Sequence, residues 1–337
     1  MSEQREFLAQ WSVSQGNLRR FLEDLALRPL DDDAQRTAGR AAAAAAVEET
    51  FGINLDDFTL GVDSVGGAFA TAGRGKITLP DPEIPQDAEA AAFFDVDNTL
   101  IQGSSLILLA KGLFRRHFIT LSELAPALWK QIRYRVSGSE NAADIAEGRE
   151  QALAVVKGKS VAELKAACKE IVDQQMLRKS YQDTVELAAM HIAAGQQVWL
   201  VSATPVQIGQ ALAEQLGFTG ALGTVAEEEE GKFTGRLVGD ILHGPGKQHA
   251  VAALAALQQL DLSKCTAYSD SINDLPMLEM VGVPVAINPD RKLRRHAKAQ
   301  GWAIRDFRSV RRVVRAGAAP VAVGVAGAWW WLRRKRR

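Results

Sequence analysis

Short apolar runs alternate with amphipathic segments through much of this 337-residue chain. Runs typical of buried strands lie at Ala91–Phe94, Val198–Val201, Cys265–Tyr268, Val283–Ile287 and Ala303–Ile304. Between the later runs, the spacing of apolar residues predicts helices, as at Val206–Leu216 and Gln248–Leu260. Strands that alternate with helices favour a parallel sheet with helices on both faces. We therefore expect an α/β fold with a doubly wound, Rossmann-like parallel-sheet core.

A long helical segment separates the first two strand-like runs. Its predicted helices lie at Leu106–Phe114, Leu121–Val136, Ala142–Lys157, Val161–Met176 and Tyr181–Ala194. We expect residues 104–194 to form a helical cap inserted into a core made of residues 91–103 and 195–308. Ligands of open α/β sheets bind at the carboxyl ends of the strands, so we expect the cap to lie above that edge.

The segments before the core show no sign of chemistry. Residues 1–60 combine helical periodicity with an alanine run at 41–46, and they lack a cluster of nucleophile, base or metal ligand. Residues 61–90 are rich in glycine, small polar residues and proline, which is typical of a linker. We expect residues 1–60 to be a helical or partly disordered extension.

Composition limits the partners and the compartment. The formal net charge is zero, so no bulk attraction to nucleic acid is expected. The two cysteines, Cys168 and Cys265, have neither paired nor metal-ligand spacing, which fits a reducing compartment. The first residues lack the pattern of a signal peptide. We therefore expect a cytoplasmic protein.

The chain ends in an apolar and then basic tail. Ala316–Leu332 is uncharged and ends in three tryptophans, and Arg333–Arg337 closes the chain. Tryptophan beside basic residues is typical of a membrane interface, but the run is short for a spanning helix and contains Pro320. An interfacial tail, a marginal single span and a disordered tail all stay open. The first two predict membrane association through Ala316–Arg337.

A four-glutamate run, Glu227–Glu230, is followed by a glycine. The flanking residues Leu222–Val225 and Phe233–Leu237 predict a β-hairpin, with the glutamates in a solvated turn.

Two aspartates, Asp95 and Asp97, follow the first strand-like run. Residues i and i+2 of an extended segment point to the same side, so these carboxylates should converge. Two anions held close together repel each other and suit a site that holds a cation or a shared proton. One carboxylate could attack phosphorus while the other moves a proton. A polar turn after the strand is the alternative.

Three further segments offer polar groups near strand ends. Ser202 lies where a helix is expected to start, which suits an anion, although it could serve only as an N-cap. Lys247 follows a Gly-Pro-Gly loop that could aim its ammonium at a phosphate, or it could be a solvated charge. Asp270 and Asp274 follow the third run, either as metal ligands or as a capped helix start.

In their order and positions, these four segments resemble the four motifs of the haloacid dehalogenase superfamily of phosphohydrolases. The resemblance covers about residues 91–308. The inserted helices resemble the cap of subclass IB, which includes phosphoserine phosphatase. The stretch 269–278 is similar to actinobacterial phosphoserine-phosphatase-like proteins.

The resemblance implies a catalytic pair and a metal. Asp95 would be the nucleophile that forms an aspartyl-phosphate, and Asp97 would act as general acid and then as general base. Mg²⁺ would be held by Asp95, the backbone carbonyl of Asp97, and Asp270, with Asp274 close by. Such oxygen ligands suit Mg²⁺, which usually keeps water and substrate phosphate in its shell.

The resemblance also implies a phosphate site. Ser202 and Lys247 would bind phosphoryl oxygens, and Asn273 would orient them. A phosphatase needs an acid for a poor alkoxide leaving group, whereas a dehalogenase does not. We therefore expect a Mg²⁺-dependent phosphomonoester hydrolase that acts on a small phosphorylated metabolite.

The chain departs from phosphoserine phosphatases at the substrate-binding positions. Ser104 stands where they place a glutamate for the substrate amine. Ala152 aligns with their cap arginine, and Arg149 is the nearest arginine. Three alternatives therefore stay open: phosphoserine phosphatase proper, a phosphatase of a membrane-facing lipid phosphate, and a catalytically idle, membrane-tethered binding module.

Overall fold

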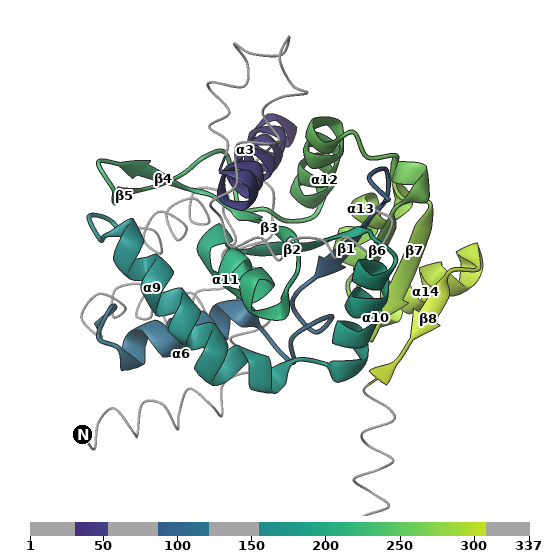
Figure 1. The fold of residues 1–337 in the computed structure, drawn as a ribbon, viewed down its shortest axis with the longest axis horizontal. Coiled ribbons are helices and arrows are strands. Elements are labelled where there is room, and N and C mark those ends of the chain that lie inside the picture. Colours follow the sequence, from purple (N-terminus) through teal and green to yellow (C-terminus); the bar gives the residue numbers. More distant parts are fainter. Residues whose placement is uncertain (1–30, 53–86, 121–154, 308–337) are drawn as a thin grey trace, which may run out of the picture.

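The five apolar runs predicted as strands all belong to one parallel sheet, which confirms the expected α/β fold. The computed structural model describes residues 31–52, 87–120 and 155–307 (Figure 1). The sheet has six strands in the order β3-β2-β1-β6-β7-β8, and every neighbouring pair is parallel. The strands are β1 (Ala91–Asp95), β2 (Gln197–Pro205), β3 (Gly220–Thr224), β6 (Thr266–Ser269), β7 (Val283–Ile287) and β8 (Ala303–Arg305).

The edge strand β3 was not predicted. Leu222–Val225 was expected to form one arm of a hairpin, but Leu222 lies in β3 and pairs with Val201 of β2. The hairpin begins one element later, as β4 (Ala226–Glu229) and β5 (Lys232–Leu237). Its turn is made by Glu230 and Gly231, both with positive φ. The expected arm was wrong because β3 is short, rich in small residues and directly followed by the hairpin.

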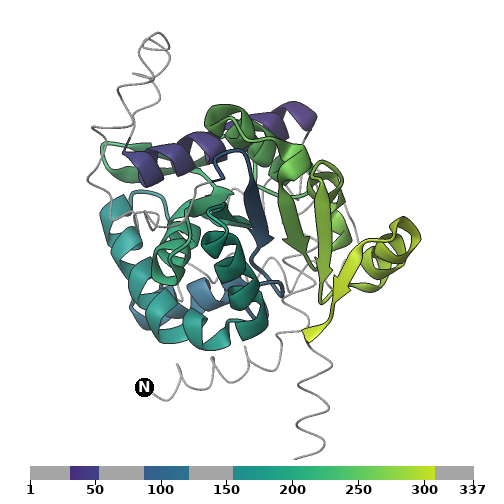
Figure 2. The same cartoon turned by 45° about the vertical axis from the view of Figure 1, so that its right-hand side comes forward.

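Helices cover both faces of the sheet (Figures 1 and 2). Strand β1 is buried throughout, and its two phenylalanines point to opposite faces. Phe94 packs with the helices α10 (Gln182–Ala193) and α11 (Val206–Leu216), and it stacks on Tyr268 with ring centroids 4.2 Å apart. Phe93 faces the helices on the other side, which are α3 (Asp32–Phe51), α12 (Pro245–Gln258), α13 (Leu275–Glu279) and α14 (Arg291–Gln300).

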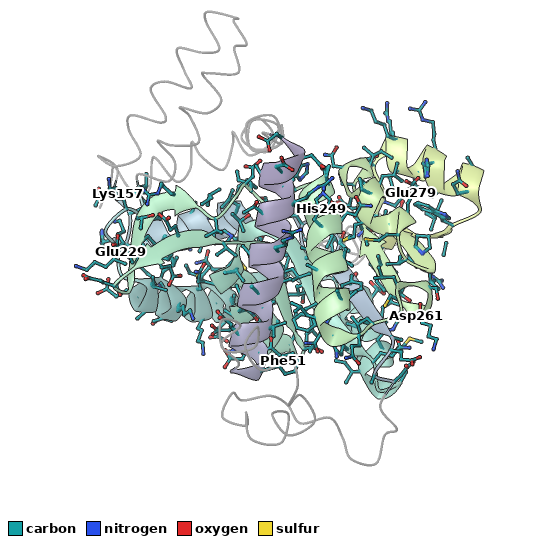
Figure 3. The ribbon with its side chains drawn as sticks, turned by 90° about the horizontal axis from the view of Figure 1, so that it is seen from above. Phe51, Lys157, Glu229, His249, Asp261 and Glu279 are labelled. Carbon is teal, nitrogen blue, oxygen red and sulfur yellow. The ribbon has the colours of Figure 1, made fainter. Side chains whose placement is uncertain are left out.

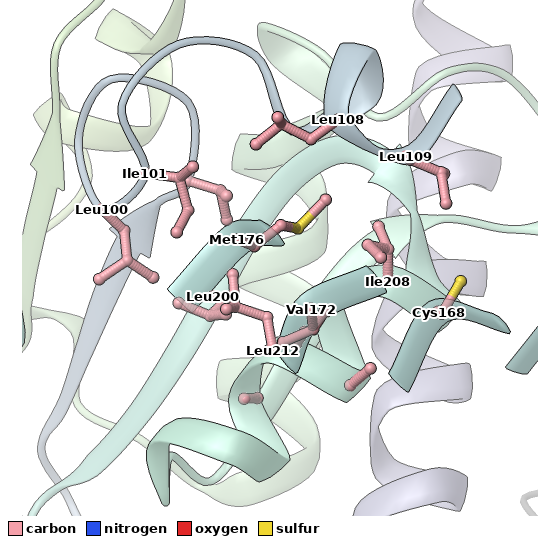
Figure 4. Close-up of a cluster of buried hydrophobic side chains, with 14 of the residues drawn as sticks. Leu100, Ile101, Leu108, Leu109, Cys168, Val172, Met176, Leu200, Ile208 and Leu212 are labelled. Atoms are coloured by element: carbon pink, nitrogen blue, oxygen red, sulfur yellow. The ribbon is translucent and has the colours of Figure 1, made fainter. Parts of the chain in front are cut away.

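The inserted segment is helical where it is described. It contains α6 (Ser105–Arg115), α9 (Val161–Ile171), a π-helical turn (Val172–Met176) and a 3₁₀ turn (Leu177–Lys179), after which α10 packs against β1 and β2. The predicted helix Leu121–Val136 and most of Ala142–Lys157 lie outside the described residues. Apolar side chains of α6, α9 and the π turn pack together with Ile208 and Leu212 of α11 (Figure 4).

Backbone hydrogen bonds tie the hairpin to the start of the inserted helices. The amide of Gly158 donates to the carbonyl of Phe233 at 2.7 Å, and the amide of Phe233 donates to the carbonyl of Lys159 at 3.1 Å. The amide of Val161 donates to the carbonyl of Gly231 at 3.0 Å. The hairpin therefore joins the core to the segment that leads into α9.

The ends of the chain are only partly described. The helix α3 lies within the predicted N-terminal extension, and it packs against α12 and β3. In the described part of the chain, no helix combines the length and apolar character needed to cross a bilayer. The tail Ala316–Arg337 lies outside the described residues, so its membrane association stays a prediction.

A test of the packing in Figure 4 is available at Gly112 of α6. A Cβ on this glycine would overlap the side chain of Ile171, which is fully buried. Because overpacking of a core forces side chains and backbone apart, we expect Gly112→Val to lower the free energy of unfolding by about 1–3 kcal/mol. Arg115→Val, on the exposed side of the same helix, is the matched control. Equal urea-unfolding midpoints for the two variants would contradict this packing.

Candidate active site

A tight loop after β1 places two aspartates at the carboxyl edge of the sheet. The carbonyl of Val96 accepts hydrogen bonds from the amides of Leu100 and Ile101, at 3.0 and 2.8 Å. Asn98 takes a positive φ of 58°, a conformation that asparagine tolerates better than most residues. Its backbone N–H donates to the carbonyl of Ile101. The chain therefore reverses directly after Asp95 and Asp97.

Asp95 is the last residue of β1 and is almost fully buried, with 5% of its surface exposed. Its Oδ2 accepts a hydrogen bond from the Thr99 hydroxyl at 3.0 Å, and its Oδ1 lies 2.6 Å from Nζ of Lys247. Both carboxylate oxygens are therefore held in place. Thr99, four residues after Asp95, was not predicted as a site residue.

Lys247 brings three elements together. It lies in the first turn of α12, after Pro245, and is 4% exposed. Its ammonium also donates to Oδ2 of Asp274 at 2.8 Å, and the same oxygen accepts from the Ser269 hydroxyl at 2.7 Å. The structure thus places Asp95, Lys247 and Asp274 in direct contact. The solvated-charge reading of Lys247 is wrong.

Burial controls the charges at this centre. It raises the pKa of Asp95 to about 7, with Asp274 and Asp97 adding to the rise and the ammonium of Lys247 opposing it. Burial alone would lower the pKa of Lys247, but the carboxylates of Asp274 and Asp95 raise it above its usual value. The lysine is therefore charged at neutral pH.

Asp97 is half-buried and faces the start of α6. Its Oδ1 accepts from the amide of Ser105 at 2.8 Å and also from the hydroxyl of Ser105. Burial raises the pKa of Asp97, and the hydrogen bonds from Ser105 oppose that rise. A carboxyl group with a raised pKa, at the junction between the sheet edge and the inserted helices, is suited to proton transfer.

Asp270 follows β6, the strand next to β1, and is 7% exposed. Its carbonyl accepts from the amide of Asp290, which caps α14. Within the described ranges, no three His, Cys, Asp or Glu side chains gather as a metal cluster. The carboxylates of Asp95 and Asp270 and the carbonyl of Asp97 are nevertheless hard oxygen donors, and Mg²⁺ commonly binds through one or two carboxylates plus water. This donor set fits Mg²⁺.

The other two predicted residues lie in different settings. Ser202 is buried inside β2, which continues to Pro205, so it is not the N-cap of α11. Its hydroxyl shares a hydrogen bond with that of Thr204 at 2.8 Å and accepts from the Thr204 amide at 3.1 Å. Asn273 is exposed, and its backbone N–H donates to the Ser271 hydroxyl at 3.2 Å.

The raised pKa of Asp95 predicts how the metal-free protein responds to pH. An unfolded aspartate has a pKa of about 3.9. In the folded protein the pKa of Asp95 is about 7, so the folded state holds this proton more tightly than the unfolded state does. The stability that the proton contributes is fully present below the pKa of the unfolded aspartate, and it is lost as the pH rises through 7. We therefore expect Asp95→Asn to raise the melting temperature in EDTA at pH 8 and to raise it less at pH 5.

The exposed Asp173→Asn is the control, and we expect it to leave both melting temperatures unchanged. A melting temperature of Asp95→Asn at or below that of the wild type at pH 8 would contradict the buried, destabilising charge.

Known proteins share this arrangement of sequence and fold. Residues 92–279 match the family described as haloacid dehalogenase-like hydrolase. Phosphoserine phosphatase SerB1 of Mycobacterium tuberculosis (strain ATCC 25618 / H37Rv) is 50% identical over 267 residues, which cover 77% of this chain and 87% of that protein. Histidinol-phosphatase of Neisseria meningitidis serogroup C (strain 8013) is 29% identical, over 64% of this chain and 98% of its own.

A protein of unknown function from Bordetella pertussis Tohama I has a similar crystal structure. Its TM-score is 0.56 at 29% identity, and the match covers 65% of this chain and 98% of that one. The family match spans more than half of the chain, and the relative at 50% identity covers more than two thirds of it. The chain belongs to the haloacid dehalogenase-like hydrolase family.

Proposed function

We propose that this enzyme is a Mg²⁺-dependent phosphatase that hydrolyses a small phosphomonoester through an aspartyl-phosphate on Asp95. The observation that carries the proposal is the buried contact of Asp95 with Lys247, whose ammonium also binds Asp274. Buried charges are costly unless they are paired, so a module without catalytic activity has little physical reason to keep them. The names of the relatives, a phosphoserine phosphatase and a histidinol-phosphatase, support phosphatase chemistry.

In this proposal Asp95 attacks the phosphorus atom and the leaving oxygen departs on the opposite side. The hydrogen bonds from Thr99 and Lys247 fix the direction of the carboxylate. Phosphoryl transfer depends mainly on positioning and on neutralising charge, and the Lys247 ammonium supplies a fixed positive charge beside the nucleophile. Bound Mg²⁺, held by Asp95, Asp270 and the carbonyl of Asp97, would offset the repulsion between the carboxylate and the phosphate dianion.

Asp97 would move the proton. Its raised pKa favours the protonated form, which can donate to the leaving oxygen. The resulting carboxylate would then take a proton from the water that hydrolyses the aspartyl-phosphate. We further propose that Ser202 binds a phosphoryl oxygen and that Asn273 orients the phosphoryl group.

Two candidates remain for the substrate: phosphoserine and another small phosphorylated metabolite. The 50% identical relative named phosphoserine phosphatase favours phosphoserine. Ser104, however, is neutral, and its hydroxyl caps α6 by accepting from the amide of Ile107 at 3.5 Å. A neutral group cannot form the charge-assisted bond that a glutamate would make to an ammonium. Arg149 and Ala152 lie outside the described residues. We propose a small phosphorylated metabolite other than phosphoserine as the first candidate.

The roles of the two aspartates are tested by isosteric substitution. We expect Asp95→Asn to abolish turnover, because an amide cannot attack phosphorus. Asp97→Asn should lower kcat by about 10²- to 10⁴-fold for an alkyl phosphate, because general acid–base catalysis contributes that much. It should lower kcat/KM, which reports the steps up to departure of the leaving group, much less for p-nitrophenyl phosphate, whose leaving group needs no proton. Near-normal turnover by Asp95→Asn would overturn the nucleophile assignment.

A screen of phosphorylated metabolites, with and without Mg²⁺, tests the reaction and the substrate together. The panel should include phosphoserine, histidinol phosphate and a lysophosphatidate. We expect phosphate release only with Mg²⁺, and a higher kcat/KM for a metabolite without an ammonium next to the ester than for phosphoserine. Phosphoserine as the best substrate would favour the second candidate. No release from any compound would favour a lipid-bound substrate or the idle module.

A further inference from the structure

The helix α3, which precedes the family-matched residues 92–279, lies directly against the helix that carries Lys247. Figure 3 shows α3, with Phe51 near its end, alongside the helix labelled at His249, which is α12. The contact is close because small residues line it. A Cβ on Gly39 would lie 2.6 Å from Cβ of His249 and 2.7 Å from the backbone nitrogen of Ala250. The small residues of α3 therefore form a packing interface with α12.

The first turn of α3 also holds the loop that leads into α12. Gln35 is 1% exposed, and its Nε2 donates to Oδ2 of Asp240 at 2.6 Å and to the carbonyl of Ile241 at 3.2 Å. Asp240 is 1% exposed, and its Oδ1 accepts from the amide of Ile241 at 2.7 Å. A buried carboxylate depends on such donors, because water cannot reach it.

The first turns of α3 touch both ends of this loop. A Cβ on Gly246, the residue before Lys247, would overlap the amide oxygen of Gln35. At the other end, Gly239 has a φ of 78°, and a Cβ there would lie 2.7 Å from the carbonyl oxygen of Ala34. The loop therefore approaches α3 closely at both positions, against backbone at Gly239 and against the end of the Gln35 side chain at Gly246. Its path from residue 239 to residue 246 is set by Gln35 and its neighbours.

We propose that Gln35 is a positioning residue for the phosphatase reaction, which acts through the 239–246 loop to fix the Lys247 ammonium between Asp95 and Asp274. The proposal rests on the proposed function. Lys247 follows the loop directly, and its backbone position decides whether Nζ reaches both carboxylates at 2.6 and 2.8 Å. Misplacement of a catalytic group by about 1 Å can cost about 10²-fold in rate.

The test compares two substitutions on α3 in the full-length protein. Gln35→Met keeps the length of the side chain and removes its donor. Thr50→Val is the matched control: Thr50 is also buried, its hydroxyl has no hydrogen-bond partner in the described part of the chain, and it packs near Gly220 at the edge strand. We expect Gln35→Met to lower kcat for p-nitrophenyl phosphate by about 10- to 100-fold. Thr50→Val should keep the wild-type kcat.

Two further readouts separate positioning from a merely structural role. In a Lys247→Met background, Gln35→Met should cause little additional loss of kcat/KM, because residues that act through one group are not additive. In the otherwise wild-type protein, acetic anhydride should modify Lys247 faster in Gln35→Met than in Thr50→Val, as measured by peptide mass spectrometry. If Gln35→Met does not fold, Gln35→Asn, which is one methylene shorter, replaces it with the same readouts.

Wild-type kcat and unchanged Lys247 acetylation in a folded Gln35 variant would overturn the proposal. The proposal would also be overturned if Gln35→Met lowered kcat/KM by the same factor in the Lys247→Met background as in the wild type, because Gln35 would then act independently of the lysine. A wild-type protein that releases no phosphate would instead overturn the proposed function. The acetylation rates would still decide whether Gln35 places Lys247.

Discussion

The contact between one ammonium and two carboxylates organises this molecule. Lys247 of α12 binds Asp95 at the end of β1 and Asp274 in the 3₁₀ turn (Ile272–Asp274) after β6. Three segments that are far apart in the sequence are thereby joined at the carboxyl edge of the sheet. All three side chains are nearly buried, so their charges are compensated mainly by one another and by hydroxyl groups such as that of Ser269. The same arrangement prepares a positive charge beside the carboxylate that we propose as the nucleophile.

The centre has a physical cost that fits its proposed chemistry. Burial disfavours the ionised form of Asp95, although the attack on phosphorus requires that form. A cation bound beside it would offset this cost and would so couple metal binding to the ionisation of the proposed nucleophile. Asp97, in contrast, faces Ser105 of the inserted segment. Asp95, at the end of β1, and Asp97, in the loop after it, therefore have different surroundings, which suit the different roles that we propose for them.

The features that could be predicted from the sequence are those that depend on the local pattern of apolar and polar residues. The apolar runs located five of the six strands and placed Asp95, Asp270 and Asp274 after strand ends, and the structure shows that the two strands concerned, β1 and β6, are neighbours. The strand β3 was missed because it is short and continues almost directly into the hairpin. The part played by α3 was missed for a different reason. Alanine and glycine have little apolar surface to detect in a sequence, and their importance comes from the close approach that they permit to α12.

In the proposed reaction, the carboxylate of Asp95 receives the phosphoryl group. The most direct measurement is acid quenching of the enzyme during turnover of a ³²P-labelled phosphomonoester in the presence of Mg²⁺, followed by peptide mapping of the label. We expect an acid-stable, hydroxylamine-sensitive label on the peptide that contains Asp95 and no label in Asp95→Asn. Turnover without any labelled peptide, or a label on a different residue, would contradict it.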